Sequence, residues 1–209
     1  MPKLPQSYYL GDDVESIARS LLGKFLFTRI DSEITGGIIT ETEAYKGISD
    51  KASHAFGGKR TKRTEVMYNQ GGVSYVYLCY GIHNLLNVVT AGVNTPHAVL
   101  IRGIYPLTGV NLMLNRTGKS KIDYNLSNGP GKLSRALGIN ANMNNVSYQS
   151  DNLWIEDKGI IVKTQDIKTG PRIGVGYAAE DASLPYRYVL IYQNYLASIL
   201  SDKKSKEYP

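Results

Sequence analysis

Two glutamates and a tyrosine alternate along the segment Glu41-Thr42-Glu43-Ala44-Tyr45. Successive side chains of a β-strand point to opposite faces, so a strand here would carry Glu41, Glu43 and Tyr45 on one face. Carboxylates are scarce in strands and costly to bury unpaired, so these two require solvent, a cation or a catalytic role. The plain alternative is a solvated edge strand, where charge prevents unwanted pairing. A catalytic strand would offer a general base beside an aromatic ring.

A second alternating segment, residues 73–80, carries three tyrosines. Its period places Tyr75 and Tyr77 on one face and Tyr80 on the opposite face, next to a turn at Gly81. The chain holds 16 tyrosines but only three phenylalanines and one tryptophan, although phenylalanine fills a core without needing a hydroxyl partner. Many rings are therefore expected to touch water or ligand. Exposed rings can stack on nucleobases, but they also form protein interfaces. A ring at a hairpin tip, such as Tyr80, can insert into a base stack or can be an ordinary surface residue.

Positive charge is concentrated in one stretch of a chain with formal net charge +6. Lys59, Arg60, Lys62 and Arg63 place four cations within five residues. Such a cluster fits an anionic partner such as nucleic acid, although a solvated basic loop is the commoner case.

Composition excludes several classes of protein. Cys79 is the only cysteine and the chain has three histidines, so an internal disulfide and a zinc site with two thiolates are excluded. We expect no metal, no cofactor and no redox role. The sequence contains no run of about 18 apolar residues and begins without the apolar core of a signal peptide, so we expect a cytoplasmic protein without a membrane partner.

The elements that would position these residues can be predicted from periodicity and turn residues. Asp12-Asp13 should cap a helix that ends near Gly23, Asp31-Ser32 should join two strands as a hairpin, and Gly36-Gly37 should weaken the second strand or mark a bulge. The stretch 46–72 lacks sustained periodicity and is predicted to be a long surface loop. The main-chain amides of Gly129-Pro130-Gly131, ahead of a helix, could face a phosphate. The predicted strands are 24–29, 33–45, 73–80, 84–90 and 98–105, the predicted helices are 14–22, 107–114 and 132–137, and short apolar segments follow at 154–162 and 188–200.

No repeat or composition shift divides the chain, so the elements indicate one α+β domain over residues 1–209 with an antiparallel or mixed sheet.

A series of short motifs runs through most of the chain: Glu41-Thr42-Glu43-Ala44-Tyr45, His54, Gly57-Gly58, Arg63, the run from Tyr75 to Gly81, Asn87, Arg102, Gly129-Pro130-Gly131-Lys132-Leu133 and Arg172-Ile173-Gly174-Val175-Gly176. In their order and spacing these motifs resemble those of the alkyladenine, or 3-methyladenine, DNA glycosylases of the single-domain type. Each motif alone is weak evidence, but so many in the same order with matching spacing are highly specific.

The resemblance implies a mainly antiparallel curved sheet flanked by helices, with a protruding β-hairpin that enters DNA. It implies that Glu43 is the general base that activates a water, which Arg102 and the main-chain carbonyl of Ile173 help to hold. It also implies that Tyr45 and Tyr77 form the two faces of a slot for the base.

The remaining implied roles concern recognition of the base and of DNA. His54 would be a wall that hydrogen-bonds the flipped base, Asn87 would disfavour the exocyclic amine of normal guanine, and Tyr80 would fill the space that the flipped base leaves. His83, beside the wedge, is expected to be a surface histidine. The implied DNA contacts are Lys59, Thr61, Arg63, Ile82, Lys132 and Gly174, with Lys132 the weaker candidate.

The predicted function is therefore that of a monofunctional DNA glycosylase, acting in base excision repair as a monomer on damaged double-stranded DNA and associated with the nucleoid when bound. It would flip alkylated or deaminated purines out of the duplex and hydrolyse the N-glycosidic bond.

Two other classes stay open as alternatives. A non-catalytic module for single-stranded nucleic acid would use the tyrosines and the basic stretch but leaves Glu43 without a role. A carbohydrate hydrolase is disfavoured, because Glu41 and Glu43 would stand about 7 Å apart along one strand rather than on opposite sides of a substrate.

Overall fold

The computed structural model describes residues 2–123 and 125–191. In this part of the chain eight strands form one antiparallel sheet, in which β3-β4-β5-β2-β1-β6 lie side by side and β8 pairs with both β2 and β7. The α+β prediction is confirmed. The strands are β1 (Phe25–Ile30), β2 (Glu33–Tyr45), β3 (Ser74–Cys79), β4 (His83–Thr90), β5 (His97–Thr108), β6 (Leu153–Glu156), β7 (Ile167–Gly170) and β8 (Arg187–Leu190).

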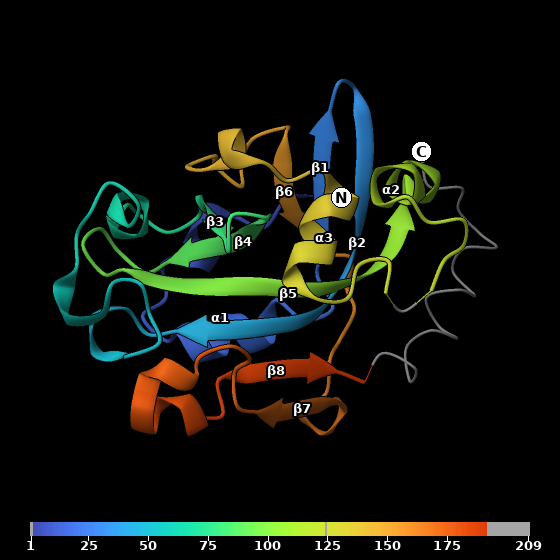
Figure 1. Cartoon of the computed structure of the whole chain (residues 1–209). Coiled ribbons are helices and arrows are strands. Elements are labelled where there is room, and N and C mark those ends of the chain that lie inside the picture. The colour runs from blue at the N-terminus through green and yellow to red at the C-terminus, as the bar shows by residue number, and fades with distance from the viewer. Residues whose placement is uncertain (1, 124, 192–209) are drawn as a thin grey trace.

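Strand β2 is the centre of the sheet. Along one side it pairs with β5, and along the other it pairs first with β1 and then, over its last residues, with β8. Figure 1 shows the long β2 and β5 ribbons running together, with β7 and β8 beyond β2. The second half of β2, which carries both glutamates, therefore lies between β5 and β8.

The predicted hairpin is present, and the pairing is irregular at the predicted glycine pair, where the extra residue lies on β5. Asp31 and Ser32 have φ of 51° and 68°, as expected for the tight turn that matches the twist of two strands. The register with β5 shifts at Gly36-Gly37, where a Cβ on Gly37 would lie 2.1 Å from the carbonyl oxygen of Tyr105. Only glycine permits this approach of two main chains.

Three α-helices are found within the described residues: α1 (Val14–Ser20), α2 (Val110–Thr117) and α3 (Pro130–Leu137). Asp13 caps α1 by accepting hydrogen bonds from the main-chain N–H groups of Glu15 and Ser16, as the sequence predicts for this end. Helix α1 packs on β2 and β5, and α3 packs on β4 and β5. Helix α3 begins at a proline, which is favourable because the first helical N–H has no partner within the helix.

Two predicted elements are wrong in part. Leu107 belongs to β5 rather than to a helix, and α2 starts only at Val110 because Gly109 turns the chain with φ of 65°. The stretch 46–72 is not simply a surface loop, since Val66, Met67 and Tyr68 are buried. Its short 3₁₀ turns escape a search for helical or strand periodicity, because each contributes only a few core residues.

The short 3₁₀ helices are η1 (Gln6–Leu10), η2 (Gly47–Ser49), η3 (Phe56–Gly58), η4 (Glu65–Tyr68), η5 (Ala141–Met143), η6 (Thr164–Asp166) and η7 (Gly176–Ser183). Of the predicted apolar segments, 154–162 contains most of β6 and 188–200 contains most of β8. Residues 192–200 of the second segment and residues 192–209 of the predicted domain lie outside the described residues. In the part that is described, none of the helices combines the length and apolar character needed to cross a bilayer.

Candidate active site

A cavity of about 520 Å³ opens between the ends of several strands and the chain after β7. Tyr45 reaches it from β2 and Tyr77 from β3, strands that β4 and β5 separate in the sheet. Most of the predicted site residues line it, namely Tyr45, His54, Arg63, Tyr77, Tyr80, Asn87, Arg102, Ile173 and Gly174. Segments far apart in sequence therefore meet where the resemblance implies.

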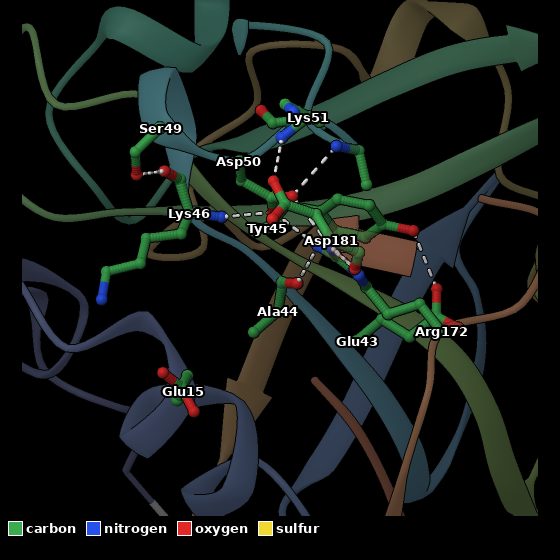
Figure 2. Close-up of polar contacts among 12 residues, drawn as sticks. Glu15, Glu43, Ala44, Tyr45, Lys46, Ser49, Asp50, Lys51, Arg172 and Asp181 are labelled. Atoms are coloured by element: carbon green, nitrogen blue, oxygen red, sulfur yellow. Dashed lines mark hydrogen bonds and ion pairs between the residues drawn. The ribbon is translucent and has the colours of Figure 1, made fainter. Parts of the chain in front are cut away.

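Glu43 lies fully buried directly behind the wall of this cavity. One carboxylate oxygen, Oε1, accepts a hydrogen bond from the main-chain N–H of Ile173 at 2.8 Å and lies 3.3 Å from Nη1 of Arg102. The other, Oε2, accepts from the Tyr45 hydroxyl at 2.8 Å, a contact visible in Figure 2. All three partners line the cavity. The main chain of Ile173 thus reaches Glu43 through its N–H, whereas the resemblance implies a role for its carbonyl.

The strand alternation that the sequence predicts is confirmed at Glu43. Thr42 points the other way and donates a hydrogen bond to the carbonyl of Ala18 in α1. Glu41 and Tyr45 lie on the same side as Glu43, since Arg102 contacts both carboxylates and the Tyr45 hydroxyl contacts Glu43.

Burial governs the electrostatics of this group. Loss of solvent raises the pKa of Glu43. Part of that rise is offset by the charge of Arg102 and by hydrogen bonds from the Ile173 N–H and the Tyr45 hydroxyl. The charge of Glu41 adds to the rise. Burial lowers the pKa of Arg102, but Glu43 and Glu41 outweigh it and the pKa is raised, so the guanidinium stays charged.

An aromatic cluster forms another part of the cavity wall. The ring of His54 lies 4.6 Å from that of Tyr77, and the Tyr75 ring lies 5.3 Å from that of Tyr77. Nδ1 of His54 shares a hydrogen bond with the Tyr75 hydroxyl at 2.8 Å. Burial, with a smaller effect from Arg63, lowers the pKa of His54 to about 4. The imidazole is therefore neutral at pH 7 and has one nitrogen that donates and one that accepts.

Asn87 extends into the cavity from β4, opposite Tyr75 in the pairing of β3 and β4. The side chain is buried, and its Nδ2 donates to the main-chain carbonyl of Tyr75 at 3.0 Å. This hydrogen bond orients the amide relative to any base in the cavity.

The rim carries an exposed hairpin tip. Tyr80 and Ile82 lie in the turn between β3 and β4 and are 88% and 73% exposed. Tyr80 was predicted on the face opposite Tyr77, but it lines the same cavity. The reason is that β3 ends at Cys79 and the φ of Tyr80 is 50°, so strand alternation no longer applies.

The predicted DNA-contact residues Lys59, Thr61, Arg63 and Lys132 differ in their surroundings. The guanidinium of Arg63 lies 4.8 Å from the ring centroid of Tyr77 and 3.3 Å from Nε2 of His54, so it belongs to the cavity wall. Lys59 and Thr61 are exposed beside it and do not line the cavity. Lys132 lies on α3, where its ammonium binds the side chain of Asn125.

Gly174 lies at the rim with φ of 80° and open space where a Cβ would stand, so its main chain is accessible. His83 is exposed, as predicted, and packs against Gly131 at the start of α3, where a Cβ would lie 2.7 Å from the imidazole.

Comparison with known proteins identifies the family. Residues 8–194, nearly the whole chain, match the family described as methylpurine-DNA glycosylase. This chain belongs to the methylpurine-DNA glycosylases. Three relatives bear the name "Putative 3-methyladenine DNA glycosylase". The one from Chlamydia felis is 46% identical over 90% of this chain and 95% of its own length. The one from Chlamydia abortus is 44% identical over 91% of this chain and 100% of its own length. The one from Bacillus thuringiensis is 47% identical over 88% of this chain and 93% of its own length.

The family confirms the predicted enzyme class. A methylpurine-DNA glycosylase is a DNA repair enzyme that hydrolyses N-glycosyl bonds, and DNA is its substrate. Within the described ranges of this glycosylase, His, Cys, Asp and Glu side chains form no group of three that could hold a metal ion.

The glycosylase site also contains a buried ion pair to which sequence reasoning assigned no role. Arg172 binds both oxygens of Asp50, at 2.5 and 2.8 Å, and donates to the carbonyl of Ala44 at 2.9 Å (Figure 2). Its guanidinium lies 4.8 Å from the centroid of the Tyr45 ring. Arg172 thereby fixes both Tyr45 and the chain that presents Ile173. The sequence pointed to Arg172 only through its place in the Arg172–Gly176 motif, because its partner Asp50 lies 122 residues away in the chain.

Proposed function

We propose that this glycosylase excises alkylated and deaminated purines, 3-methyladenine among them, from double-stranded DNA. The damaged nucleotide would be flipped into the 520 Å³ cavity and its N-glycosidic bond hydrolysed by a water that Glu43 activates, leaving an abasic site. The observation that carries the proposal is the buried Glu43 carboxylate, which is bound by three residues of an aromatic-lined cavity. The names of the relatives support 3-methyladenine as a substrate.

For an alkylated purine the chemistry needs a base more than an acid, whereas a neutral deaminated purine must also gain a proton from solvent as it leaves. A purine alkylated on a ring nitrogen carries positive charge, so the electrons of the breaking C1′–N bond neutralise it as it leaves. Water adds to C1′ of the resulting oxocarbenium-like sugar, and Glu43 takes the proton of that water. The negative charge of Glu43 also stabilises the sugar cation. Arg102 and the Ile173 main chain would hold the carboxylate and the water together.

The aromatic walls supply selectivity. A cationic or electron-poor base between the electron-rich faces of Tyr45 and Tyr77 gains about 0.5 to 2 kcal/mol per cation–π contact, which a normal adenine does not. His54 is neutral at pH 7, so it would hydrogen-bond the base without repelling a cationic one. Asn87 would disfavour the exocyclic amine of guanine.

DNA binding would involve the rim. Tyr80 would enter the space that the flipped base vacates, with Ile82 beside it. Lys59, Thr61, Arg63, Lys132 and the main chain of Gly174 would contact phosphates, a role that carries no sequence information.

We infer that the enzyme has no lyase activity. Cleavage of the DNA strand at the abasic product requires an amine nucleophile, and among the described residues no lysine lines the cavity. Borohydride reduction during turnover should therefore trap no covalent complex of protein and DNA. A trapped complex would show a Schiff base and overturn the hydrolytic mechanism.

The decisive experiment is Glu43→Gln. The amide keeps the shape of the side chain but accepts no proton, so base release from a duplex with 3-methyladenine should fall at least about a hundredfold while DNA affinity is retained. Glu33→Gln, an exposed position at the start of the same strand, is the matched control and should act as wild type. A fully active Glu43→Gln enzyme would overturn the choice of base.

Membership of an enzyme family leaves no support for the alternative of a non-catalytic module for single-stranded nucleic acid, which would release no base with or without Glu43.

A further inference from the structure

Glu41 is a second buried carboxylate in β2, and the proposed reaction leaves it without a role. It is 5% exposed, and its Oε1 accepts hydrogen bonds from Nε of Arg102 at 2.8 Å and from Nε of Arg187 at 2.6 Å. Arg102 comes from β5 and Arg187 from β8, the two strands that flank this half of β2. Glu41 therefore ties together three strands at the level of the active site.

Arg102 is shared between two carboxylates. Its Nε binds Glu41 while its Nη1 lies 3.3 Å from Glu43. A guanidinium is planar and rigid, so a hydrogen bond that fixes Nε also fixes the direction of Nη1. The β2–β5 register shifts on both sides of Glu41, between Ile39 and Glu41 and between Glu41 and Thr42. Such irregularities redirect side chains and are common next to active sites.

Stability alone does not account for Glu41. Its charge makes ionisation of Glu43 less favourable, since it raises the pKa of that group. Buried ion pairs are often replaced by apolar residues without loss of stability. What Glu41 contributes is the orientation of Arg102, whose charge has the opposite effect on Glu43.

We propose that Glu41 is a positioning residue of this glycosylase: held by Arg187 of β8, it fixes the guanidinium of Arg102 so that Nη1 stays against the base Glu43. This inference rests on the proposed role of Glu43. The charged and titratable groups around Glu43 are Arg102 from β5, Tyr45 and Glu41 from β2, Arg187 opposite it on β8, and more remotely Arg172 beside Tyr45. Among these, Arg102 is the group whose direction Glu41 controls.

The test is the single-turnover rate of 3-methyladenine release from a duplex, measured between pH 5 and 8 for Glu41→Gln. We expect about a tenfold loss at neutral pH, because small misplacements of a site group are costly, with DNA affinity unchanged. The acid limb should move to higher pH, because Arg102 lowers the pKa of Glu43 more than Glu41 raises it, so misalignment of Arg102 outweighs removal of the Glu41 charge. A purely structural role would lower the melting temperature, and removal of the Glu41 charge alone would then move the limb to lower pH.

A double-mutant cycle shows whether Glu41 acts through Arg102. In an Arg102→Ala background, Glu41→Gln should change the rate by less than about twofold. If the two losses instead multiply, Glu41 acts independently of Arg102 and the proposal fails.

Arg187→Ala provides a second variant that is expected to fold, because the Arg187 side chain is 29% exposed. It should shift the acid limb in the same direction as Glu41→Gln, by a smaller amount. Wild-type rates and pH profiles for both Glu41→Gln and Arg187→Ala, with Glu43→Gln inactive, would overturn this inference and leave the proposed function standing. An active Glu43→Gln enzyme would overturn the proposed function itself.

Discussion

The chemistry of the site depends on how one carboxylate is solvated. Glu43 has lost all contact with solvent, and that loss raises its pKa more than a guanidinium, a main-chain N–H and a phenol lower it. A general base works best when its pKa approaches the working pH, so partial compensation suits catalysis better than the tight pairing of a structural ion pair. Burial thus serves function here at a cost in stability.

Base release should depend on pH. The proposed base Glu43 would act only when unprotonated and its folded pKa is raised above the usual 4.5, so single-turnover base release should fall on acidification with a midpoint above pH 4.5. The residual activity of Glu43→Gln should lack this limb. A wild-type midpoint at or below pH 4.5 would contradict the raised pKa.

Asn87→Ser should relax discrimination against guanine. The shorter side chain leaves room for the exocyclic amine and cannot reproduce the hydrogen bond to the Tyr75 carbonyl. Release of 3-methylguanine relative to 3-methyladenine should rise, and losing the buried hydrogen bond should cost about 1 kcal/mol of stability. An unchanged ratio of the two products in a correctly folded variant would count against a selectivity role.

At the scale of elements, a short hairpin and a helix terminus shape the mouth of the cavity. The three-residue turn between β3 and β4 holds Tyr80 and Gly81 in left-handed conformations, and Gly131 at the start of α3 packs against His83 at the base of that turn. The exposed ring of Tyr80 is thus carried by a turn that α3 braces. The proposed role of Tyr80 as a wedge requires a turn that resists displacement, and this packing would provide that support.

Tyr80→Ala should weaken binding to a lesion duplex by about 1 to 3 kcal/mol, the usual contribution of one stacked ring. Cleavage of an already unpaired base should suffer less, because no vacated space then needs filling. Comparing excision rates on duplex and single-stranded substrates tests this, and equal losses on both would refute the wedge.

At the scale of the whole molecule, charge distribution matters more than the net charge of +6. Lys59 is exposed and does not line the cavity, whereas Arg63 lies against Tyr77 and His54. The two cations therefore have different surroundings, although both are proposed to contact phosphates.

Lys59→Ala should lower affinity for damaged and undamaged DNA alike and reduce the salt dependence by about one unit of slope. Arg63→Ala should have the same effect and, because it also forms part of the cavity wall, should slow excision from bound DNA. Binding measured over a range of salt concentrations tests this, with Lys119→Ala as a control, since Lys119 pairs with Asp123 away from the cavity. Unchanged slopes for both variants would remove this stretch from the interface.

Local sequence determined which side chains share a face. The alternation of Glu41, Glu43 and Tyr45, the hairpin at Asp31-Ser32 and the irregular pairing at Gly36-Gly37 all follow from interactions between residues close in the chain, and all are present. The ordered motifs added the family, which the comparisons confirm.

Only the tertiary structure decided what surrounds Glu43. Arg102 and Ile173 reach it by strand pairing and by chain packing across more than 50 residues, and the register of β2 with β5 shifts on both sides of Glu41, which no local pattern predicts. Glu41 and Glu43 are equivalent by strand alternation. The fold makes them different because Glu41 meets two guanidinium groups, whereas Glu43 meets one, together with the N–H and hydroxyl groups of the cavity wall.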